Sequence, residues 1–460
     1  MASSSFSHTP ITVDKVETKY RKIITQIPVP ESIPFIERLY KLESHSMHGQ
    51  MPIVWDRAVG FQVYDKWGNK WIDFTSTIFV TNSGHGNPRI IHALENVLKK
   101  PLLHTYTYLS EERIEYLEYL IENTPIQFQK AFLLSAGTET TEVALKLMRL
   151  NGEKYSPNKK VVICFEGNWH GRTLGAQMMS GNPAQKSWMG YHDPNIIHLP
   201  FPYPWIMESE KEPRKFFRDS LNAVCAEKGI DPQKDVCGIM METFQGWGAI
   251  FYPKEFVHEV ETYTKEVNAL LAFDEMQAGF GRTGKLFGYM NYEVEPDILC
   301  CGKGVSSSLP LSLVLGSAEI MDLPDIGSMS STHSANPMVC AAGLANLKAI
   351  LEDGLLENSR RFGLLFHVEL NKLLNLFPDH IYLIQGKGLI AAMIFKSKAG
   401  EPLSKLCDKI SELCLQRGLL VVHTGRDSIK LAPPLVITKD ALLEGISVLK
   451  ESIKDAIQVI

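Results

Sequence analysis

Two ionisable side chains of opposite charge follow consecutive apolar segments in the middle of the sequence. Asp274 comes directly after Leu270–Phe273, and Lys303 follows the next apolar segment, between Gly302 and Gly304. Such segments are typical of strands buried in a parallel sheet, and open α/β sheets bind ligands at their carboxyl edge. Glycines beside the lysine let the backbone approach a bound group closely. A buried ion pair would explain the two charges equally well.

Pyridoxal phosphate accounts for more of this pattern, because its chemistry requires both groups. A carboxylate keeps the pyridine nitrogen protonated, whereas a lysine binds the aldehyde as a Schiff base and then moves a proton as a general base. A lysine in that role needs a lowered pKa, which burial near other cationic groups provides. The hypothesis is therefore a pyridoxal phosphate enzyme with Asp274 and Lys303 as catalytic residues.

The same cofactor needs a phosphate site and an aromatic ring over its pyridine face. Gly137 and Thr138 stand at the start of a predicted helix, whose free N–H groups would attract a phosphate. Thr138 taken alone could equally be an ordinary N-cap. Trp169 is the candidate for the ring, although an isolated tryptophan more often belongs to the core.

The elements that would position these residues alternate between helices and short apolar strands from about residue 88. Apolar periodicity predicts helices over residues 88–99, 111–122 and 138–150, and buried strands over residues 160–165, 236–241, 270–273 and 297–301. An earlier strand pair is expected at residues 59–65 and 70–74, around the turn 66–69. The fold class expected is α/β, with a mainly parallel sheet.

The chain is long enough for more than one domain. We expect an N-terminal segment that joins a small domain, a large cofactor-binding domain, and a C-terminal small α+β domain, at residues 1–75, 76–335 and 336–460.

Charge and cysteine usage limit the class of protein. The net charge of −5 and the lack of a Lys/Arg run make nucleic acid or an anionic membrane surface unexpected as a partner. The opening Met1–Phe6 has no secretory-signal character, and the longest apolar segments are strand-sized. The eight cysteines form no C-x-x-C pair, which favours reduced thiols in a cytoplasmic protein over disulfides or a metal site.

Five motifs occur in the order found in class III (ω-type) aminotransferases, and the sequence from about residue 50 to its end resembles that family. The motifs are Ser-Ala-Gly-Thr-Glu at 135–139, Trp-His-Gly-Arg-Thr at 169–173, Glu-Thr-Phe-Gln-Gly at 242–246, the aspartate loop at 273–284 and Gly-Lys-Gly at 302–304. Asn336-Pro337 and Ala432–Leu435 continue the match.

The resemblance implies the fold type I architecture and a homodimer with each active site at the subunit interface. Lys303 would then form the Schiff base, Asp274 would pair with the pyridine nitrogen, and Gln277 would bond the cofactor's 3-hydroxyl. The resemblance also implies further cofactor contacts from Glu242, from Trp169 as the stacked ring, and, around the phosphate, from Gly137, Thr138 and Thr332 of the partner subunit.

The substrate half of the site departs from the family. Members acting on ornithine or 4-aminobutyrate carry a Glu–Arg pair that opens to admit a carboxylate, and those positions hold Trp247 and Lys430 here. Lysine binds a carboxylate as a point charge, without the fork of arginine. His423 stands where amine-using members have a mobile arginine, and Arg426 follows three residues later. Arg172 matches the arginine that binds the distal carboxylate in 4-aminobutyrate members.

The predicted function is transfer of an amino group from an ω-amino acid, diamine or amine to a 2-oxo acid such as pyruvate or 2-oxoglutarate. Arg172, Arg426 and Lys430 are the candidate carboxylate binders. A pyridoxal phosphate aminomutase or decarboxylase is the alternative, because these enzymes share the cofactor motifs and Trp247 weakens the case for a two-substrate cycle.

Two further hypotheses are disfavoured. Gly279–Lys285 resembles both G-x-G-x-x-G and a P-loop, but Leu286 stands where a P-loop needs Ser or Thr, and no helix signal follows. We therefore expect a tight irregular loop rather than a nucleotide site. A catalytically silent scaffold would need none of Lys303, Asp274 and Gln277.

Overall fold

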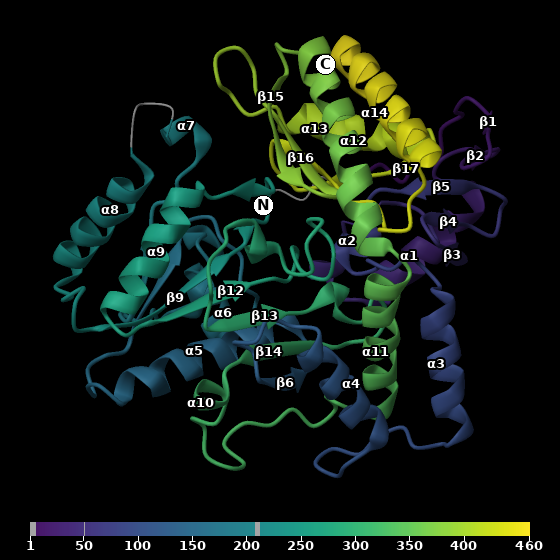
Figure 1. The fold of residues 1–460 in the computed structure, drawn as a ribbon. Coiled ribbons are helices and arrows are strands. Elements are labelled where there is room, and N and C mark those ends of the chain that lie inside the picture. Colours follow the sequence, from purple (N-terminus) through teal and green to yellow (C-terminus); the bar gives the residue numbers. More distant parts are fainter. Residues whose placement is uncertain (1–5, 50, 208–211) are drawn as a thin grey trace.

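A seven-stranded sheet lies between helices that cover both of its faces (Figure 1). The computed structural model describes residues 6–49, 51–207 and 212–460, so the opening residues 1–5 of the sequence lie outside it. In spatial order the strands are β6 (Lys130–Leu134), β14 (Ser312–Gly316), β13 (Ile298–Cys301), β12 (Leu270–Asp274), β9 (Val236–Glu242), β7 (Val161–Phe165) and β8 (Ile196–Leu199). Only β14 runs antiparallel to its neighbours. The expected α/β class with a mainly parallel sheet is confirmed.

The two faces of this sheet have different cores. Alternate strand residues such as Met240, Ala272 and Cys300 pack toward α5 (Gly137–Glu153), with α6 (Leu174–Met179) and α10 (Ala318–Met321) nearby. The opposite face packs against α4 (Glu111–Glu122), α8 (Pro213–Lys228), α9 (Lys254–Glu266) and α11 (Pro337–Glu352). Because side chains alternate along a strand, Glu242 and Asp274 continue the face that α5 covers.

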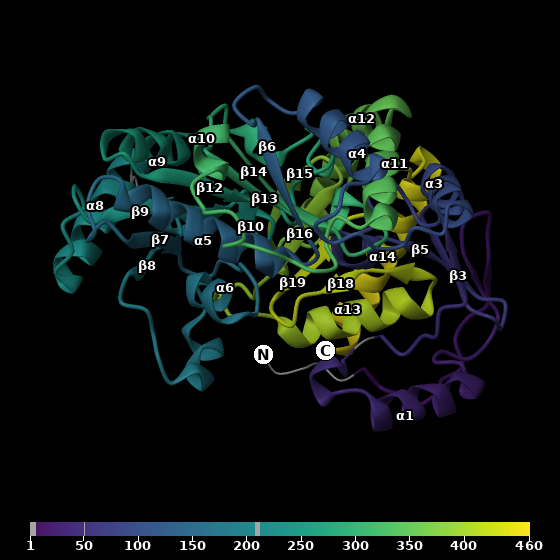
Figure 2. The ribbon, with the colours of Figure 1, turned by 90° about the horizontal axis from the view of Figure 1, so that it is seen from below.

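Both ends of the chain meet beside a second, antiparallel sheet. Its strands are β15 (Ile381–Lys387), β16 (Ile390–Phe395), β19 (Ser428–Leu431) and β18 (Val422–His423), and it packs with α12 (Leu355–Leu376), α13 (Ser404–Gln416) and α14 (Lys439–Val459). Figure 2 shows β16 and β19 beside β10 (Phe244–Gln245), which pairs with β11 (Ile250–Phe251) in a separate two-stranded sheet.

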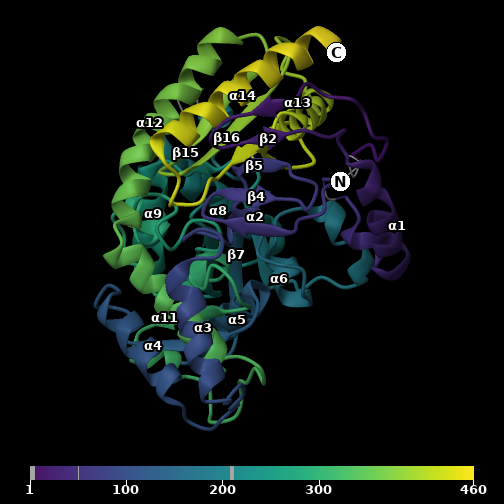
Figure 3. The ribbon, with the colours of Figure 1, turned by 90° about the vertical axis from the view of Figure 1, so that its right-hand side faces the viewer.

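The N-terminal strands join this region through a strand from the other end of the chain. They are β1 (Val16–Glu17), β2 (Lys22–Ile23), β3 (Arg57–Val59), β4 (Gln62–Tyr64) and β5 (Lys70–Asp73). Helix α1 (Ile33–Leu42) lies between β2 and β3 along the chain. β17 (Leu419–Leu420) pairs in parallel with β5, so purple and yellow segments lie together in Figure 3. α11 instead lies against α3 (Pro88–Lys99) and α4. The domain limits after residues 75 and 335 stay predictions.

Most predicted elements form, with informative exceptions. α3 and α4 have the predicted bounds, and α5 is longer than predicted at both ends. The strand pair expected at residues 59–65 and 70–74 forms as the antiparallel pair β4 and β5. β4 is shorter than predicted, because Gly60 takes a φ of +61° and turns the chain between β3 and β4. β6, β8 and β14 were not predicted. Among the described residues, no helix is both long and apolar enough to cross a membrane.

Arg282 ties the loop after β12 to both ends of the chain. Its side chain is wholly buried, and Nη1 donates to the carbonyls of Leu389 (3.0 Å) and Pro433 (2.6 Å). Nη2 donates to Asn82 Oδ1 at 2.7 Å and to Ser76 Oγ at 3.1 Å. The loop itself is a series of turns, which agrees with the tight irregular loop expected, and a short 3-10 helix, Gly288–Asn291, follows it rather than an α-helix.

We predict that Arg282→Met lowers the free energy of unfolding by about 3–5 kcal/mol, because it leaves buried acceptors without their donor. Denaturant unfolding of the purified variant measures the loss. Arg360→Met, at an exposed arginine on α12, serves as the control and should leave the midpoint unchanged. An unfolding midpoint of R282M equal to that of the native chain would show that the hydrogen bonds of Arg282 do not stabilise the fold.

Candidate active site

The carboxyl edge of the large sheet brings two carboxyl groups side by side. Asp274 ends β12 and Glu242 ends β9, and the two residues are direct partners in the parallel register. Both side chains are buried on the face that α5 covers. The N–H of Met276 donates to Asp274 Oδ1 at 3.0 Å, so the turn after the strand fixes the aspartate.

A histidine to which the sequence analysis gave no role holds the other oxygen of Asp274. His170 Nδ1 lies 2.9 Å from Asp274 Oδ2. His170 Nε2 is buried, and no residue that the structure describes hydrogen bonds to it. His170 does belong to the motif around Trp169, but one buried histidine has no spacing pattern that would reveal its partner.

Lys303 begins a short turn two residues after β13 ends. Its φ of +49° places it in the left-handed region, which is strained for a residue with a side chain. Burial lowers the pKa of Lys303, while the negative charges of Asp274 and Glu242 oppose that shift. A lowered pKa is the property that a nucleophilic lysine requires.

Burial beside Asp274 changes the protonation of Glu242. Burial and repulsion from Asp274 raise the pKa of Glu242 to about 8, although the N–H groups of Trp169 (3.0 Å) and Gly246 (3.3 Å) donate to its Oε2. The edge therefore holds one carboxyl, that of Glu242, whose pKa is raised above neutral pH. Carboxyl groups with strongly raised pKa values are typical of active sites.

The N-terminus of α5 opens onto the same edge. Glu139 uses its Oε2 to accept the N–H groups of Ser135 and Ala136, each at 2.8 Å. The N–H groups of Gly137 and Thr138 lie in the first turn, where a helix provides no acceptor. They are available to an anion, as predicted for the phosphate.

The start of α5 lies close to the segment that carries Lys303 and to the loop that carries Arg172. A Cβ on Gly137 or on Gly302 would lie 2.5 Å from the sulfur of Met276, so both backbones approach the loop after Asp274. The hydroxyl of Thr138 lies 2.7 Å from that of Thr173, a second threonine that the sequence analysis did not single out.

Trp169 and Arg172 lie together at the rim of this edge. The Trp169 side chain is half-buried, and the guanidinium of exposed Arg172 lies 4.5 Å from its ring centroid. The backbone N–H of Trp169 binds Glu242, which fixes the start of the loop. The stacking of Trp169 on a cofactor ring stays a prediction.

Lys430 makes its hydrogen bonds to protein oxygens. Its Nζ donates to the carbonyl of Gly246 at 2.7 Å and to Gln277 Oε1 at 2.9 Å, and the side chain is buried. Burial, followed by repulsion from Lys303, lowers the pKa of Lys430 to about 7. The residue predicted to bind a substrate carboxylate is thus engaged with Gln277, the residue predicted to contact the cofactor.

Trp247 instead meets Arg426. The Arg426 guanidinium lies 3.8 Å from the ring centroid of Trp247, whose indole N–H donates to Gln245. Tyr203 lies 6.3 Å from Trp247 by ring centroids and stacks on Trp205 at 4.5 Å. This side of the site is therefore formed by aromatic side chains, and the exposed guanidinium of Arg426 lies on them.

The remaining predicted residues are held by their own neighbours. His423 Nδ1 accepts the N–H of Gly425 at 2.9 Å, and its Nε2 lies 2.9 Å from Asp408 Oδ1. Thr332 is exposed, and its carbonyl accepts a hydrogen bond from His104 Nε2 at 2.9 Å.

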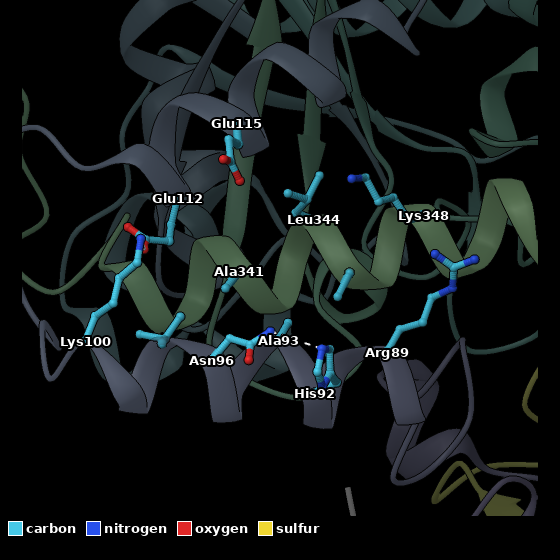
Figure 4. A pocket seen from close by; sticks show the side chains of 12 residues that line it. Arg89, His92, Ala93, Asn96, Lys100, Glu112, Glu115, Ala341, Leu344 and Lys348 are labelled. Atoms are coloured by element: carbon cyan, nitrogen blue, oxygen red, sulfur yellow. Dashed lines mark hydrogen bonds and ion pairs between the residues drawn. The ribbon is translucent and has the colours of Figure 1, made fainter.

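A separate groove of about 370 Å³ lies between α3, α4 and α11 (Figure 4). Ala341 and Leu344 form part of its apolar floor, and charged side chains such as Arg89 and Glu112 stand at its rim. None of its lining residues is a predicted site residue. No group of His, Cys, Asp and Glu side chains within the described ranges could hold a metal ion.

Comparison with known proteins identifies the family. The family described as aminotransferase class III matches residues 44–453, which is nearly the whole chain. The chain belongs to the class III aminotransferases. This aminotransferase is 30% identical to the alanine/serine racemase of Pyrococcus horikoshii, over 98% of this chain and 96% of the relative. It is also 30% identical to the 4-aminobutyrate aminotransferase of Mycobacterium leprae, over 95% of this chain and 98% of the relative.

Solved structures agree with the fold of this aminotransferase. The ornithine aminotransferase from Toxoplasma gondii superposes with a TM-score of 0.82 at 24% identity, covering 94% of this chain and 97% of that one. A transaminase from the marine bacterium Virgibacillus gives a TM-score of 0.82 at 25% identity, covering 92% and 99%. The expected fold type I architecture is confirmed.

The edge residues of this aminotransferase fit pyridoxal phosphate, the cofactor of the family. Each oxygen of Asp274 has one protein partner, so lone pairs remain for a protonated ring nitrogen. The unsatisfied Nε2 of His170 marks a buried place where a further partner is expected. Lys303 offers an amine of lowered pKa, and the first turn of α5 offers N–H groups to a phosphate.

We predict that Glu242→Gln stabilises the cofactor-free aminotransferase increasingly as pH rises. The pKa of Glu242 in the folded protein lies above the ordinary pKa of a glutamate. The stability that its carboxyl contributes is therefore fully present below the ordinary pKa and is lost as the pH rises toward 8. Glutamine does not ionise, so the melting temperature of E242Q minus that of the native chain should grow between about pH 5 and about pH 8.

Glu122→Gln, on the exposed side of α4, is the matched control and should show a constant difference in melting temperature. A constant difference for E242Q as well would mean that Glu242 is not the buried, protonated carboxyl described above.

Proposed function

We propose that this aminotransferase moves an amino group from an ω-amino acid, diamine or amine to a 2-oxo acid. The observation that carries the proposal is the convergence of Lys303, Asp274 and the N-terminus of α5 at one sheet edge, in a chain of this family. Each provides what one part of the cofactor requires: an amine, a carboxylate and an anion site.

The residues at this edge divide the work between them. Pyridoxal phosphate, when bound, supplies the electron sink that makes the substrate's α-proton removable. Lys303 would hold the cofactor through its amine and would move the substrate proton as a general base. Asp274, fixed by His170 and Met276, would keep the ring nitrogen protonated, and the first turn of α5 would hold the phosphate.

We infer that Arg426 binds the carboxylate of the 2-oxo acid. Lys430 donates two hydrogen bonds, to Gly246 and Gln277, and Arg172 stands over Trp169 at the rim. Arg426 rests with one face on Trp247, and no residue within the described ranges accepts a hydrogen bond from its guanidinium, which can therefore donate two parallel hydrogen bonds to a carboxylate. Trp247 carries no charge that would compete for the guanidinium.

A racemase is a second candidate, because a relative of that name matches almost the whole chain. The buried Lys430, whose pKa is lowered and which interacts electrostatically with Lys303, is a second amine in the same region. Loss of enantiomeric purity in an amino acid incubated without any 2-oxo acid would favour it. Carbon dioxide release or isomerised product would favour the decarboxylase or aminomutase alternative.

We also infer a homodimer in which Thr332 of the partner subunit completes each phosphate site. Exposed apolar side chains gather near residue 104, and the bond from His104 places this segment beside Thr332. The exposed side chains are Leu98, Leu102, Leu103, Tyr108 and Leu109. Exposed apolar surface of this kind marks interfaces between proteins.

The eight cysteines are all free and buried, which supports a reducing, cytoplasmic location. Neither nucleic acid nor a membrane is proposed as a partner.

We predict that the purified protein binds pyridoxal phosphate with a visible absorption band, and that amine donors without acceptor remove the band. Borohydride reduction followed by peptide mass analysis should place the cofactor on Lys303. Lys303→Ala should lose both the band and the labelled peptide. Lys285→Ala removes the exposed lysine of the P-loop-like segment and should change neither. A cofactor attached elsewhere, or no band at all, would overturn the proposal.

We predict that Arg426→Met raises KM for the 2-oxo acid roughly tenfold to a hundredfold, because a hydrogen bond to a charged group contributes about 1.5–3 kcal/mol. The turnover number should change much less. Arg172→Met is the comparison variant, and steady-state kinetics of both variants decide between the two arginines. A rise in KM for R172M alone would place the carboxylate beside Trp169 instead.

A further inference from the structure

Lys430 joins the small sheet to two loops of the large domain. It lies on β19, where it pairs in register with Ala392 of β16 and Val422 of β18. Its Nζ reaches the carbonyl of Gly246, after β10, and the amide of Gln277, after β12. One buried ammonium therefore contacts both loops that carry cofactor-site residues.

This ammonium fixes which way the Gln277 amide faces. In its protonated form Lys430 has donors and no acceptor, so Gln277 presents its oxygen to Lys430, at 2.9 Å, and turns its NH₂ group elsewhere. Gly246 supports the same orientation, because a Cβ at this position would collide with Gln277 Nε2. The amide is held between a donor on one side and a bare backbone on the other.

A strained segment holds an aromatic ring against the same ammonium. Lys430 Nζ lies 4.4 Å from the ring centroid of Phe79, a cation–π contact. Phe79 ends α2 (Ser76–Phe79), a turn in which the φ values run from +46° to +69°. Left-handed backbone costs free energy at each residue with a side chain, so contacts elsewhere must offset it. The Ser76 hydroxyl supplies one by donating to the carbonyl of Ala432 at 2.6 Å.

We propose that Lys430 is a positioning residue that orients Gln277 toward the cofactor and does so only while the small sheet is seated on the large domain. This inference rests on the proposed function. It assigns Lys430 a task different from carboxylate binding, which passes to Arg426. The charges of Lys303 and Glu242 both act on the pKa of Lys430, so its ammonium lies within the electrostatic environment of the cofactor amine.

The test compares Lys430→Met, Lys430→Arg, Gln277→Leu and the K430M/Q277L double variant as cofactor-loaded proteins. K430M should shift the visible absorption of the resting protein in the same direction as Q277L. The double variant should shift no further than Q277L alone, because Lys430 acts through that amide. K430R, which keeps a cationic donor, should retain the native spectrum. The kcat of K430M should fall roughly tenfold while KM for the 2-oxo acid stays within about twofold, the pattern of a lost positioning contact.

Three outcomes would overturn the inference. A raised KM with an unchanged spectrum would make Lys430 the carboxylate binder. Additive spectral shifts in the double variant would mean that Lys430 acts on the cofactor without Gln277. A native spectrum in K430M would remove the positioning role altogether. If K430M does not fold, Lys430→Gln, whose uncharged amide has two N–H donors and one acceptor oxygen, carries the same comparison. Absence of any visible band in the native protein would instead refute the proposed function.

Discussion

Two carboxyl groups forced together in a buried sheet edge are the constraint on which this site depends. The parallel register of β9 and β12 makes Glu242 and Asp274 direct neighbours on one face, out of contact with water. Burial and repulsion from Asp274 raise the pKa of Glu242 to about 8. The two oxygens of Asp274 are instead fixed by His170 and by the N–H of Met276, which leaves lone pairs for a protonated ring nitrogen.

Burial also shifts the pKa values of the two lysines in this region. Lys303 and Lys430 are both desolvated, and each has a lowered pKa. Lys430 donates hydrogen bonds to two oxygens and lies against one aromatic ring. These contacts stabilise its ammonium form. The small sheet therefore contributes a charge to the large sheet's edge. Together with Arg282, which binds both chain ends, it makes the cofactor site dependent on how the two sheets are seated.

The substrate side shows how one replacement changes the tasks of its neighbours. Trp247 follows Gly246 and carries no charge, and Lys430 of β19 donates to Gln277. The guanidinium of Arg426 covers the face of Trp247. We propose on these contacts that Lys430 positions the cofactor site and that Arg426 recognises the carboxylate.

The sequence by itself determined the α/β fold, the cofactor and the position of Asp274 at a strand end, because buried parallel strands are short and apolar and end where ligands bind. It also determined α3 and α4, whose apolar periodicity is strictly local. It could not place the turn at Gly60, where backbone conformation overrides an alternating pattern. Only the tertiary structure decided that His170 holds Asp274, that Lys430 holds Gln277 and that Arg426 covers Trp247. Each of these contacts joins segments far apart in the chain, and no local propensity encodes which distant side chain will satisfy a buried donor or charge.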